Sequence, residues 1–233
     1  MVALATYNEI ENLPRIVDEI LQALPDADVL VVDDNSPDGT GRWCDERAVT
    51  EPRIRCLHRP GKLGLGSATL EAAQRAIDEG YTILITLDAD GSHDPRYVVD
   101  LVRATDQADV AIGSRYCEGG AIEGWPVGRR VLSRAVNALS RRLLRLPARD
   151  TSGAFRAYRV SALQKINLSQ VEARGFAYLE ELLWRLARSG ATFIEVPITF
   201  HQRRAGKSKI SVHEGAGKII TIGKLTWRGM FDR

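Results

Sequence analysis

The sequence predicts an α/β fold of a single domain, in which a mostly parallel sheet carries helices on both faces. Short apolar runs alternate with segments of helical periodicity over roughly the first half of the 233 residues. The runs are continuous, which is typical of parallel strands buried on both faces. Acidic or glycine-rich clusters follow these runs at 33–34, 61–66 and 88–90. Ligands bind such sheets at the carboxyl ends of the strands, so we expect the three clusters to converge in space.

The first part of the chain supplies most of the predicted sheet. Strands are expected at 2–5, 29–32, 54–57, 83–87 and 110–112, and helices at 40–48, 68–79 and 95–105. A further helix is expected from Asn8 or Glu9, because apolar residues recur at helical spacing from Leu13 to Leu24. Beyond about residue 115 the alternation decays. The elements expected there are a helix at 131–144, a strand at 153–158, a helix at 178–188, a strand at 192–200 and a last helix to about Trp227.

Charge is balanced over the whole chain but not along it. The formal net charge of +2 indicates no nucleic-acid partner. Residues 125–149 nevertheless hold seven arginines and no acid, and residues 201–233 hold eight Lys or Arg against Glu214 and Asp232. The three cysteines lack paired or metal-like spacing and are expected to be reduced thiols. We see no secretory leader and no apolar stretch of ~18 residues, so we expect no segment to span a bilayer.

The turn Asp88-Ala89-Asp90 directly follows the apolar strand predicted at 83–87. Two carboxylates at the end of a buried strand are costly to hold together unless a cation shares them. Mg²⁺ and Mn²⁺ take oxygen ligands, commonly one or two carboxylates together with substrate phosphates. The alternative is a plain capping turn with solvated acids. The position after a strand, followed by Ser92-His93-Asp94-Pro95, favours the metal site.

Other charged residues follow strands in the same way. The carboxylate of Asp34 could accept hydrogen bonds from a nucleobase or ribose. Alternatively, it could stabilise a turn through its own backbone, and this is the role we expect for Asp38. The loop Gly61–Gly66 lacks the Gly-Lys-Ser/Thr ending of a Walker A motif, and tight turning is the expected role of most of its glycines. Cations near a metal–phosphate site neutralise a leaving diphosphate, and the candidates are Arg115, Arg203, Lys207 and Lys209.

Taken together, these motifs resemble those of the dolichol-phosphate (polyprenol-phosphate) mannosyltransferases, inverting enzymes with a GT-A type fold. The matching stretches run in order from residue 5 to about residue 210. They are Thr6-Tyr7-Asn8-Glu9, Val32–Thr40, Arg59–Gly66, Leu87–Asp90, Gly113–Tyr116, Trp125-Pro126 with Arg129-Arg130, Asp150–Gly153, and Arg203 with Gly206, Ser208 and Lys209. The chain departs from the family pattern at Ala5 (usually Pro), Gly91 (usually Leu) and Gln202 (usually Asp).

The resemblance implies a role for each matching residue. Those that would hold the guanosine part of the donor are Tyr7, Glu9, Val32 and Asp34. Those that would line the diphosphate and the metal are Asp88, Ala89 and Asp90, with Ser92 as a further metal ligand. Contacts to the donor phosphates or the acceptor phosphate would come from Arg115, Arg203 and Lys209. The catalytic set is then Asp90, Arg115 and Arg203, with Mg²⁺ or Mn²⁺ as cofactor.

The implied reaction is transfer of mannose from GDP-mannose to a polyprenyl (dolichyl) phosphate. A phosphate group has a second pKa near ~6, so the acceptor is largely dianionic at neutral pH and needs no general base. This agrees with a sequence of four histidines in no base–nucleophile arrangement, where His93 is expected to be structural. Two anionic substrates repel each other, and Arg115, Arg129, Arg130 and Arg203 are expected to offset this repulsion.

The basic second half of the chain offers a membrane-binding surface. In the helix at 131–144, Leu132, Val136 (or Ala135), Leu139 and Leu143 fall on one face, while Arg134, Arg141 and Arg145 fall on another. Such a helix either binds an anionic membrane surface or packs its apolar face into the core. The last helix offers the same choice. We expect a catalytic domain at 1–210, a basic amphipathic helix at 211–233, and peripheral attachment to the cytoplasmic face of a membrane or a membrane-embedded partner subunit.

Two rival functions stay open at this point. A related enzyme could transfer glucose or another sugar from a UDP-linked donor, and it would share the same motifs. A non-catalytic nucleotide-binding regulator is disfavoured, because both acidic residues of the turn and the cationic loop are intact. A nucleotidyltransferase would need an early glycine-rich loop with a basic residue, and none precedes Asp33.

Overall fold

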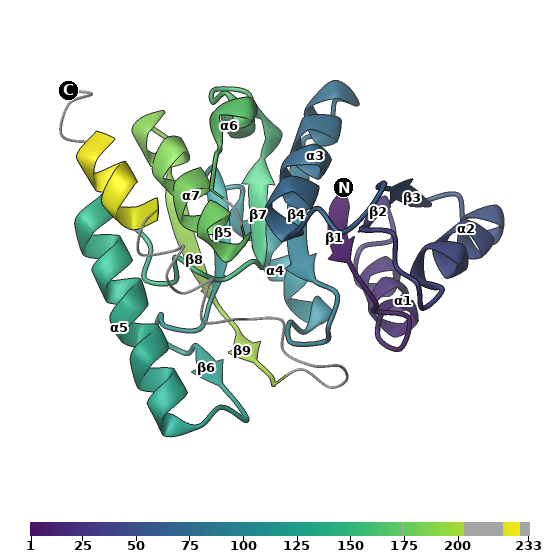
Figure 1. The fold of residues 1–233 in the computed structure, drawn as a ribbon, viewed down its shortest axis with the longest axis horizontal. Helices are drawn as coiled ribbons and strands as arrows, with labels where there is room; N and C mark the ends of the chain where they lie inside the picture. The colour runs from purple at the N-terminus through teal and green to yellow at the C-terminus, as the bar shows by residue number, and fades with distance from the viewer. Residues whose placement is uncertain (174, 203–220, 229–233) are drawn as a thin grey trace.

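The structure is a computed structural model that describes residues 1–173, 175–202 and 221–228. A seven-stranded sheet in the order β3-β2-β1-β4-β7-β5-β8 forms its centre (Figure 1). The strands are β1 (Val2–Thr6), β2 (Val29–Asp33), β3 (Ile54–His58), β4 (Ile83–Asp88), β5 (Val110–Ser114), β7 (Arg156–Arg159) and β8 (Phe193–Pro197). All neighbouring strands run parallel except β7, which is antiparallel to both β4 and β5. The predicted mostly parallel sheet is therefore confirmed.

Helices cover both faces of this sheet (Figure 1). They are α1 (Leu13–Ala23), α2 (Thr40–Thr50), α3 (Leu65–Asp78), α4 (Val98–Ala104), α5 (Val127–Leu144), α6 (Val160–Leu163) and α7 (Tyr178–Arg188). Short 3-10 turns occur at η1 (Pro95–Tyr97), η2 (Leu168–Gln170) and η3 (Gly175–Ala177), and a small second sheet pairs β6 (Ala121–Ile122) with β9 (Thr199–Phe200). Residues 221–228 form a further helix.

Besides a small cluster of Ala154, Tyr178 and Leu179, the core consists of two large clusters, one on each side of the sheet. Successive strand residues alternate between them, as Val2 and Ala3 do in β1. Helices α1 and α4 pack on the first side and α3, α6 and α7 on the second. Helix α3 buries Ala68, Ala72 and Ala76, whose small side chains let the helix approach the sheet closely. This three-layer arrangement is the single α/β domain that the sequence predicts.

Several predicted boundaries differ from those in the structure. Helix α1 begins at Leu13 rather than near Asn8, because Pro14 occupies the first turn and Asn8 has a left-handed φ of 57°. Helix α5 begins at Val127, four residues before the predicted start. The strand predicted at 153–158 is confined to β7 and runs antiparallel.

The predicted C-terminal segment 211–233 is described only at 221–228. That helix buries Ile222 and Leu225 in the same cluster as the sheet residues on one face, so this part packs on the catalytic domain. No helix among the described residues has both the length and the apolar character needed to cross a bilayer.

Candidate active site

The ends of three parallel strands bring the two acidic clusters to one edge of the sheet. Thr6 of β1 pairs with Asp33 of β2, and Ala5 of β1 pairs with Asp88 of β4. Because neighbouring strands lie about 4.8 Å apart, the ends of β2 and β4 are separated by about 10 Å. The glycine-rich loop follows β3 at the same edge. The convergence expected from the sequence is confirmed.

The acidic turn at the end of β4 is held by its own backbone. Asp88 is the last residue of the strand, and Gly91 turns the chain with a φ of 76° that favours glycine. The amide of Ser92 donates a hydrogen bond of 2.9 Å to Oδ1 of Asp90. Two carboxylates and the Ser92 hydroxyl thus lie within one five-residue turn, with Asp90 and Ser92 almost fully buried. This set of oxygen donors fits a hard divalent cation such as Mg²⁺ or Mn²⁺.

His93 supports this turn from the interior. Its Nδ1 accepts a hydrogen bond of 3.2 Å from the amide of Asp88, and its ring lies 5.2 Å from the rings of both Phe155 and Phe200. Burial lowers the pKa of His93 to about 4, although the Asp90 carboxylate opposes this effect. The imidazole is therefore neutral at pH 7 and packed between aromatic rings. This environment agrees with the expectation that His93 is structural.

Asp34 is engaged by the glycine-rich loop. Its Oδ1 pairs with Nη1 of Arg59 at 2.6 Å, and its Oδ2 accepts a hydrogen bond of 2.7 Å from the amide of Gly64. Arg59 and Asp34 are each 5% exposed. Arg59 also donates to the hydroxyl of Ser67, at the start of α3, at 2.6 Å. The carboxylate therefore fixes the loop 61–66 against the end of β2. The role of Arg59 could not be predicted from the sequence, because its partner Asp34 lies 25 residues away.

The other residues expected at the guanosine site differ in accessibility. Tyr7 follows β1, and the Nζ of Lys62 lies 4.5 Å from the centre of its ring. Glu9 is 5% exposed, and its Oε2 accepts a hydrogen bond of 3.0 Å from Asn12. Val32 lies inside β2 with its side chain in the core and 1% exposed, so its side chain has almost no surface to offer a ligand. Asp38 makes the expected turn, because its Oδ1 accepts from both the amide and the hydroxyl of Thr40.

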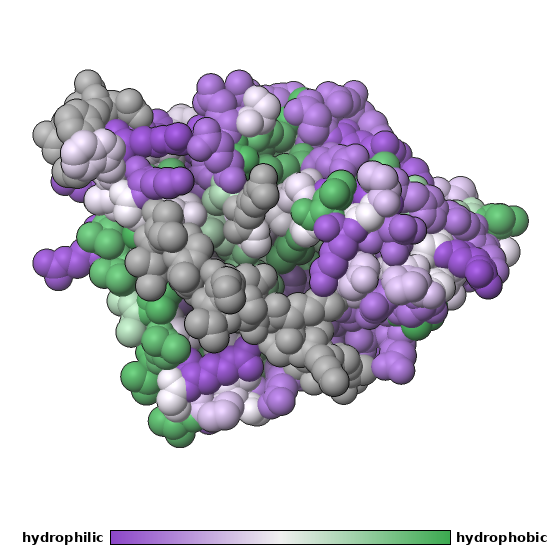
Figure 2. Space-filling view, viewed as in Figure 1, coloured by the Kyte–Doolittle hydropathy of each residue, from purple (hydrophilic) through white to green (hydrophobic). Residues whose placement is uncertain are grey.

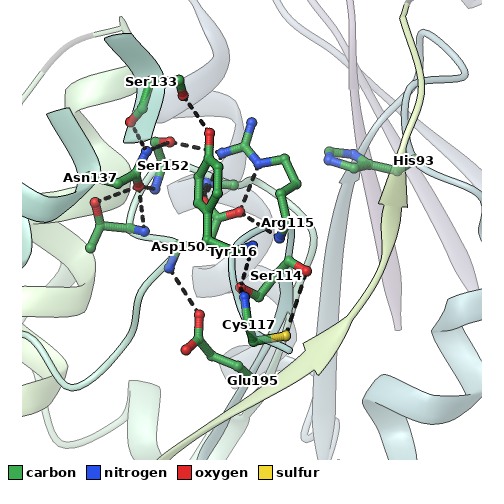
Figure 3. A network of polar contacts seen from close by, with 12 residues as sticks. His93, Ser114, Arg115, Tyr116, Cys117, Ser133, Asn137, Asp150, Ser152 and Glu195 are labelled. Atoms are coloured by element: carbon green, nitrogen blue, oxygen red, sulfur yellow. Dashed lines mark hydrogen bonds and ion pairs between the residues drawn. The ribbon is translucent and has the colours of Figure 1, made fainter. Parts of the chain in front are cut away.

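Arg115 is buried in a bidentate ion pair with Asp150 (Figure 3). Its Nε lies 2.7 Å from Oδ2, its Nη2 lies 2.7 Å from Oδ1, and Nη2 also donates to the hydroxyl of Ser152 at 2.9 Å. Burial opposes the charged form of Arg115, but the carboxylate of Asp150 outweighs it and raises the guanidinium pKa. The expected cation is thus present, with two of its nitrogens bound by the protein itself.

Aromatic rings enclose Arg115 and extend toward α5. The guanidinium carbon lies 5.2 Å from the ring centres of Tyr116 and Phe200 and 5.8 Å from that of Trp125. Trp125 also contacts Phe200, with ring centres 5.3 Å apart. Arg129 lies 3.8 Å over the Trp125 ring, and Nε of Arg130 donates to the Trp125 carbonyl at 3.0 Å. A continuous wall therefore runs from His93, beside the acidic turn, to the exposed arginines at the start of α5.

The remaining cations expected at the site, Arg203, Lys207 and Lys209, lie outside the described residues. The segment that leads to them is described as far as Gln202. The amide of His201 donates a hydrogen bond of 3.0 Å to the carbonyl of Ser92. Ala89 is 3% exposed and its side chain belongs to the core.

A second cluster of possible ligand atoms lies near β3 and was missed from the sequence. Within the described ranges, Asp45, Cys56 and His58 are the one group of three such side chains whose ligand atoms lie within 4.8 Å of one another. Nε2 of His58 lies 2.8 Å from Oδ1 of Asp45, and Cys56 is a half-buried free thiol. This cluster offers the soft sulfur of Cys56 and the imidazole of His58. The acidic turn offers only oxygen ligands, which are the ligands that Mg²⁺ prefers.

A mostly parallel α/β sheet with an acidic turn at the end of a central strand is the arrangement expected of the GT-A type glycosyltransferases. The chain belongs to glycosyl transferase family 2, whose profile matches residues 1–167. This membership confirms the class of protein that the sequence motifs indicated.

Two relatives match this chain along its whole length. The polyprenol monophosphomannose synthase of Mycolicibacterium smegmatis is 43% identical over 235 residues, which cover 100% of this chain and 89% of that protein. The undecaprenyl-phosphate mannosyltransferase of Micrococcus luteus is 42% identical over 237 residues, which cover 100% of this chain and 98% of that protein. The resemblance to polyprenol-phosphate mannosyltransferases is thereby confirmed.

Solved structures share the fold at lower identity. Glucosyl-3-phosphoglycerate synthase from Mycobacterium tuberculosis, in complex with Mn²⁺, UDP and glucosyl-3-phosphoglycerate, has a TM-score of 0.69 at 19% identity, over 97% of this chain and 79% of that one. TarS of S. aureus, in complex with UDP-GlcNAc, has a TM-score of 0.62 at 15% identity, over 96% of this chain and 65% of that one. These similarities establish the GT-A fold.

Proposed function

We propose that the protein transfers mannose from GDP-mannose to the phosphate group of a polyprenyl phosphate, with inversion at C1 of the sugar. The main observation behind this proposal is that the acidic turn Asp88–Asp90 lies at the same edge of the sheet as Asp34. The full-length similarity to a polyprenol monophosphomannose synthase and an undecaprenyl-phosphate mannosyltransferase supports the choice of sugar and acceptor.

We propose that Asp88, Asp90 and Ser92 hold Mg²⁺ or Mn²⁺ together with the donor diphosphate. The fit rests on the oxygen donors of a single turn and on the hydrogen bond that orients Asp90 toward the Ser92 amide. When bound, a divalent cation neutralises charge on the leaving diphosphate. The Mn²⁺ named for the M. tuberculosis synthase, which shares the fold, supports a metal here without choosing between the two ions.

The residues at the end of β1 and β2 are proposed to hold the nucleoside. Tyr7 and Glu9 follow β1 at the edge of the acidic clusters, and Asp34 fixes the glycine-rich loop beside them. Lys62 belongs to the same loop, and its ammonium group lies over the Tyr7 ring, beside the proposed site of the base. Val32 would contribute through its backbone, because its side chain lies in the core.

The reaction forms a bond between an acceptor phosphate oxygen and C1 while the bond from C1 to the GDP oxygen breaks on the opposite face. A dianionic phosphate needs no proton removed, so the buried and neutral His93 is compatible with this chemistry. Arg129 and Arg130 are exposed at the start of α5 and are proposed to attract the acceptor phosphate. Arg115, Arg203 and Lys209 are proposed to contact the donor phosphates or the acceptor phosphate. Arg115 would also hold the aromatic wall in place through its ion pair with Asp150.

A polyprenyl acceptor lies in a bilayer, so we propose that the protein acts at the cytoplasmic face of a membrane, attached peripherally or through a membrane-embedded partner subunit. A UDP-sugar donor is the second candidate. The observation in its favour is that UDP or a UDP-sugar is named for both structural neighbours.

Radiolabelled GDP-mannose with polyprenyl phosphate, with and without divalent metal, tests the proposed reaction. We expect a metal-dependent lipid product. Heat unfolding with Mg²⁺ compares the donors: protection by UDP-glucose but not GDP-mannose would make the sugar assignment wrong. Nucleotide protection without turnover on any acceptor would favour a non-catalytic regulator.

A further inference from the structure

A thiol, an imidazole and a carboxylate meet between α2 and the edge strand β3. Cys56 and His58 are two residues apart in β3, so their side chains lie on the same face of the sheet, the face that α2 covers. Asp45 reaches them from α2, and its Oδ1 lies 2.8 Å from Nε2 of His58. In the strand register, three strand spacings, or about 14 Å, separate His58 from Asp88. The cluster is therefore distinct from the oxygen ligands of the acidic turn.

Asp45 orients the imidazole of His58 so that its second nitrogen faces the thiol. An ionised carboxylate can only accept a hydrogen bond, so Nε2 carries the proton and Nδ1 of the neutral ring carries the lone pair. This Nδ1 lies 3.8 Å from Sγ of Cys56. A tetrahedral Zn²⁺ ion, with bonds of about 2.3 Å to sulfur and about 2.1 Å to nitrogen, holds these two ligands about 3.6 Å apart. The observed separation is close to that value, and a carboxylate on the far nitrogen is the usual partner of a zinc-bound imidazole.

Gly41, in the first turn of α2, leaves space beside Nδ1 of His58. Its backbone is helical, so its conformation does not require glycine. A Cβ atom at this position would lie 3.1 Å from Nδ1 of His58 and 3.1 Å from Oδ2 of Asp33. The glycine therefore keeps open a space that has an imidazole nitrogen on one side and a carboxylate oxygen on the other.

The surroundings of the Cys56 thiol favour a metal ion over covalent modification. Contact with the thiol of Cys44, burial, and the negative charges of Asp45 and Asp33 raise the pKa of Cys56. A protonated thiol is a poor nucleophile, whereas a coordinated metal ion deprotonates a thiol outright. The two carboxylates also attract a cation to this position. Thiolate and imidazole ligands suit Zn²⁺, and Mg²⁺ prefers oxygen ligands.

We propose that Cys56 and His58 bind a Zn²⁺ ion at the outer end of β3, with Asp45 orienting His58 and solvent completing the coordination. The side chains of His58 and Asp45 are 52% and 58% exposed. Figure 2 shows mainly polar side chains over the end of the molecule that α2 and β3 form in Figure 1. An ion from solution can therefore reach the site without any opening of the fold. Two protein ligands with open positions make a reversible site, unlike the closed four-ligand sites of structural zinc.

Titration with Co²⁺, a spectroscopic substitute for Zn²⁺, tests the proposal. The whole chain is used with Asp90→Asn and excess Mg²⁺, so that the acidic turn does not compete for the ion. We expect this protein to bind one Co²⁺ per chain with a thiolate-to-cobalt absorption band in the near ultraviolet, and Zn²⁺ to displace the Co²⁺. Adding Cys56→Ser or His58→Gln should abolish the band. Cys117→Ser is the matched control, because Cys117 is also a half-buried free thiol, and it should leave the band unchanged.

Two further variants keep both proposed ligands and test the geometry. Asp45→Asn should weaken Co²⁺ binding about 10- to 100-fold, the usual effect of removing a carboxylate behind a metal-bound imidazole. Gly41→Ala should also weaken it, because the new methyl group occupies the space beside Nδ1 of His58. Zn²⁺ should raise the melting temperature of the Asp90→Asn protein but not that of the protein that also carries Cys56→Ser.

Three results would overturn the proposal. The first is an Asp90→Asn protein without a thiolate-to-cobalt band, which would leave His58 and Asp45 as a plain surface ion pair. The second is a band that persists after Cys56→Ser. The third is an equal loss of the band in Cys117→Ser. The titration contains neither donor nor acceptor, so its outcome does not depend on whether the protein transfers mannose.

Discussion

Arg115 and Asp150 form a buried bidentate ion pair, with both N–O distances at 2.7 Å and the carboxylate wholly inaccessible to solvent. Oδ2 of Asp150 also accepts a bond of 3.0 Å from the Arg115 amide, and Oδ1 accepts one of 3.0 Å from the amide of Gly153. One side chain thus fixes the exit of β5 and the loop that enters β7. Arg115 consequently acts as an anchor of the aromatic wall around it.

Asp150→Asn should destabilise the fold by about 3–5 kcal/mol, because it leaves a buried guanidinium without its counter-charge. Denaturant unfolding measures this difference. Asp18→Asn is the control, since the pair of Asp18 with Arg47 is largely exposed and should contribute at most about 1 kcal/mol. Equal stability of the two variants would contradict the role of Asp150 as an anchor.

The ion pair of Arg115 with Asp150 should also make the stability of the folded protein depend on pH in the acid range. Burial would raise the pKa of Asp150, but the charge and hydrogen bonds of Arg115 lower it below its ordinary value. A carboxyl whose pKa falls on folding stabilises the protein above its unfolded pKa, about 4 for Asp, and this contribution is lost as pH falls toward the folded pKa. Wild type should therefore lose more stability than Asp150→Asn between about pH 5 and the acid limit of folding. Urea midpoints over this range test it, and parallel curves for the two proteins would exclude the coupling.

A second ion pair should control donor binding. Arg59 and Asp34 hold the loop 61–66 against the end of β2, so Asp34→Asn should raise the KM for the donor more than it lowers kcat. Loss of a charged hydrogen bond of this kind corresponds to about 1.5–3 kcal/mol, or roughly 10- to 100-fold. Glu71→Gln is the matched control, because Glu71 also contacts Arg59, at 3.3 Å, but is 47% exposed. An equal rise in KM for both variants would show that the buried contact has no special role.

The sequence allowed the layers and the acidic turn to be predicted, because both are encoded locally. Apolar runs and helical spacing need only a short window, and Asp88 follows its strand directly. The partners of the cations could not be found in this way: Arg115 meets Asp150 across 35 residues, and Arg59 meets Asp34 across 25. The periodicity of α5 showed two faces but not which one is buried. In the structure, the side of α5 that carries Asn137 faces inward, because Asn137 is hydrogen-bonded to the loop at 151–152.

The acidic turn yields the sharpest test of the proposed chemistry. Asp90→Asn removes a carboxylate charge at nearly constant volume, so the fold and the bond from the Ser92 amide can persist while the affinity for a divalent cation falls. We expect turnover to be abolished, and heat protection by GDP-mannose to become insensitive to added Mg²⁺ or Mn²⁺. Ser92→Ala removes a neutral ligand and should reduce turnover less, with an increased demand for metal. Asp100→Asn, an exposed acid on α4, is the control and should behave as wild type. Turnover retained by Asp90→Asn, or equal rates of the wild type with and without a chelator, would remove the metal from the mechanism and leave the arginines as the stabilising charges.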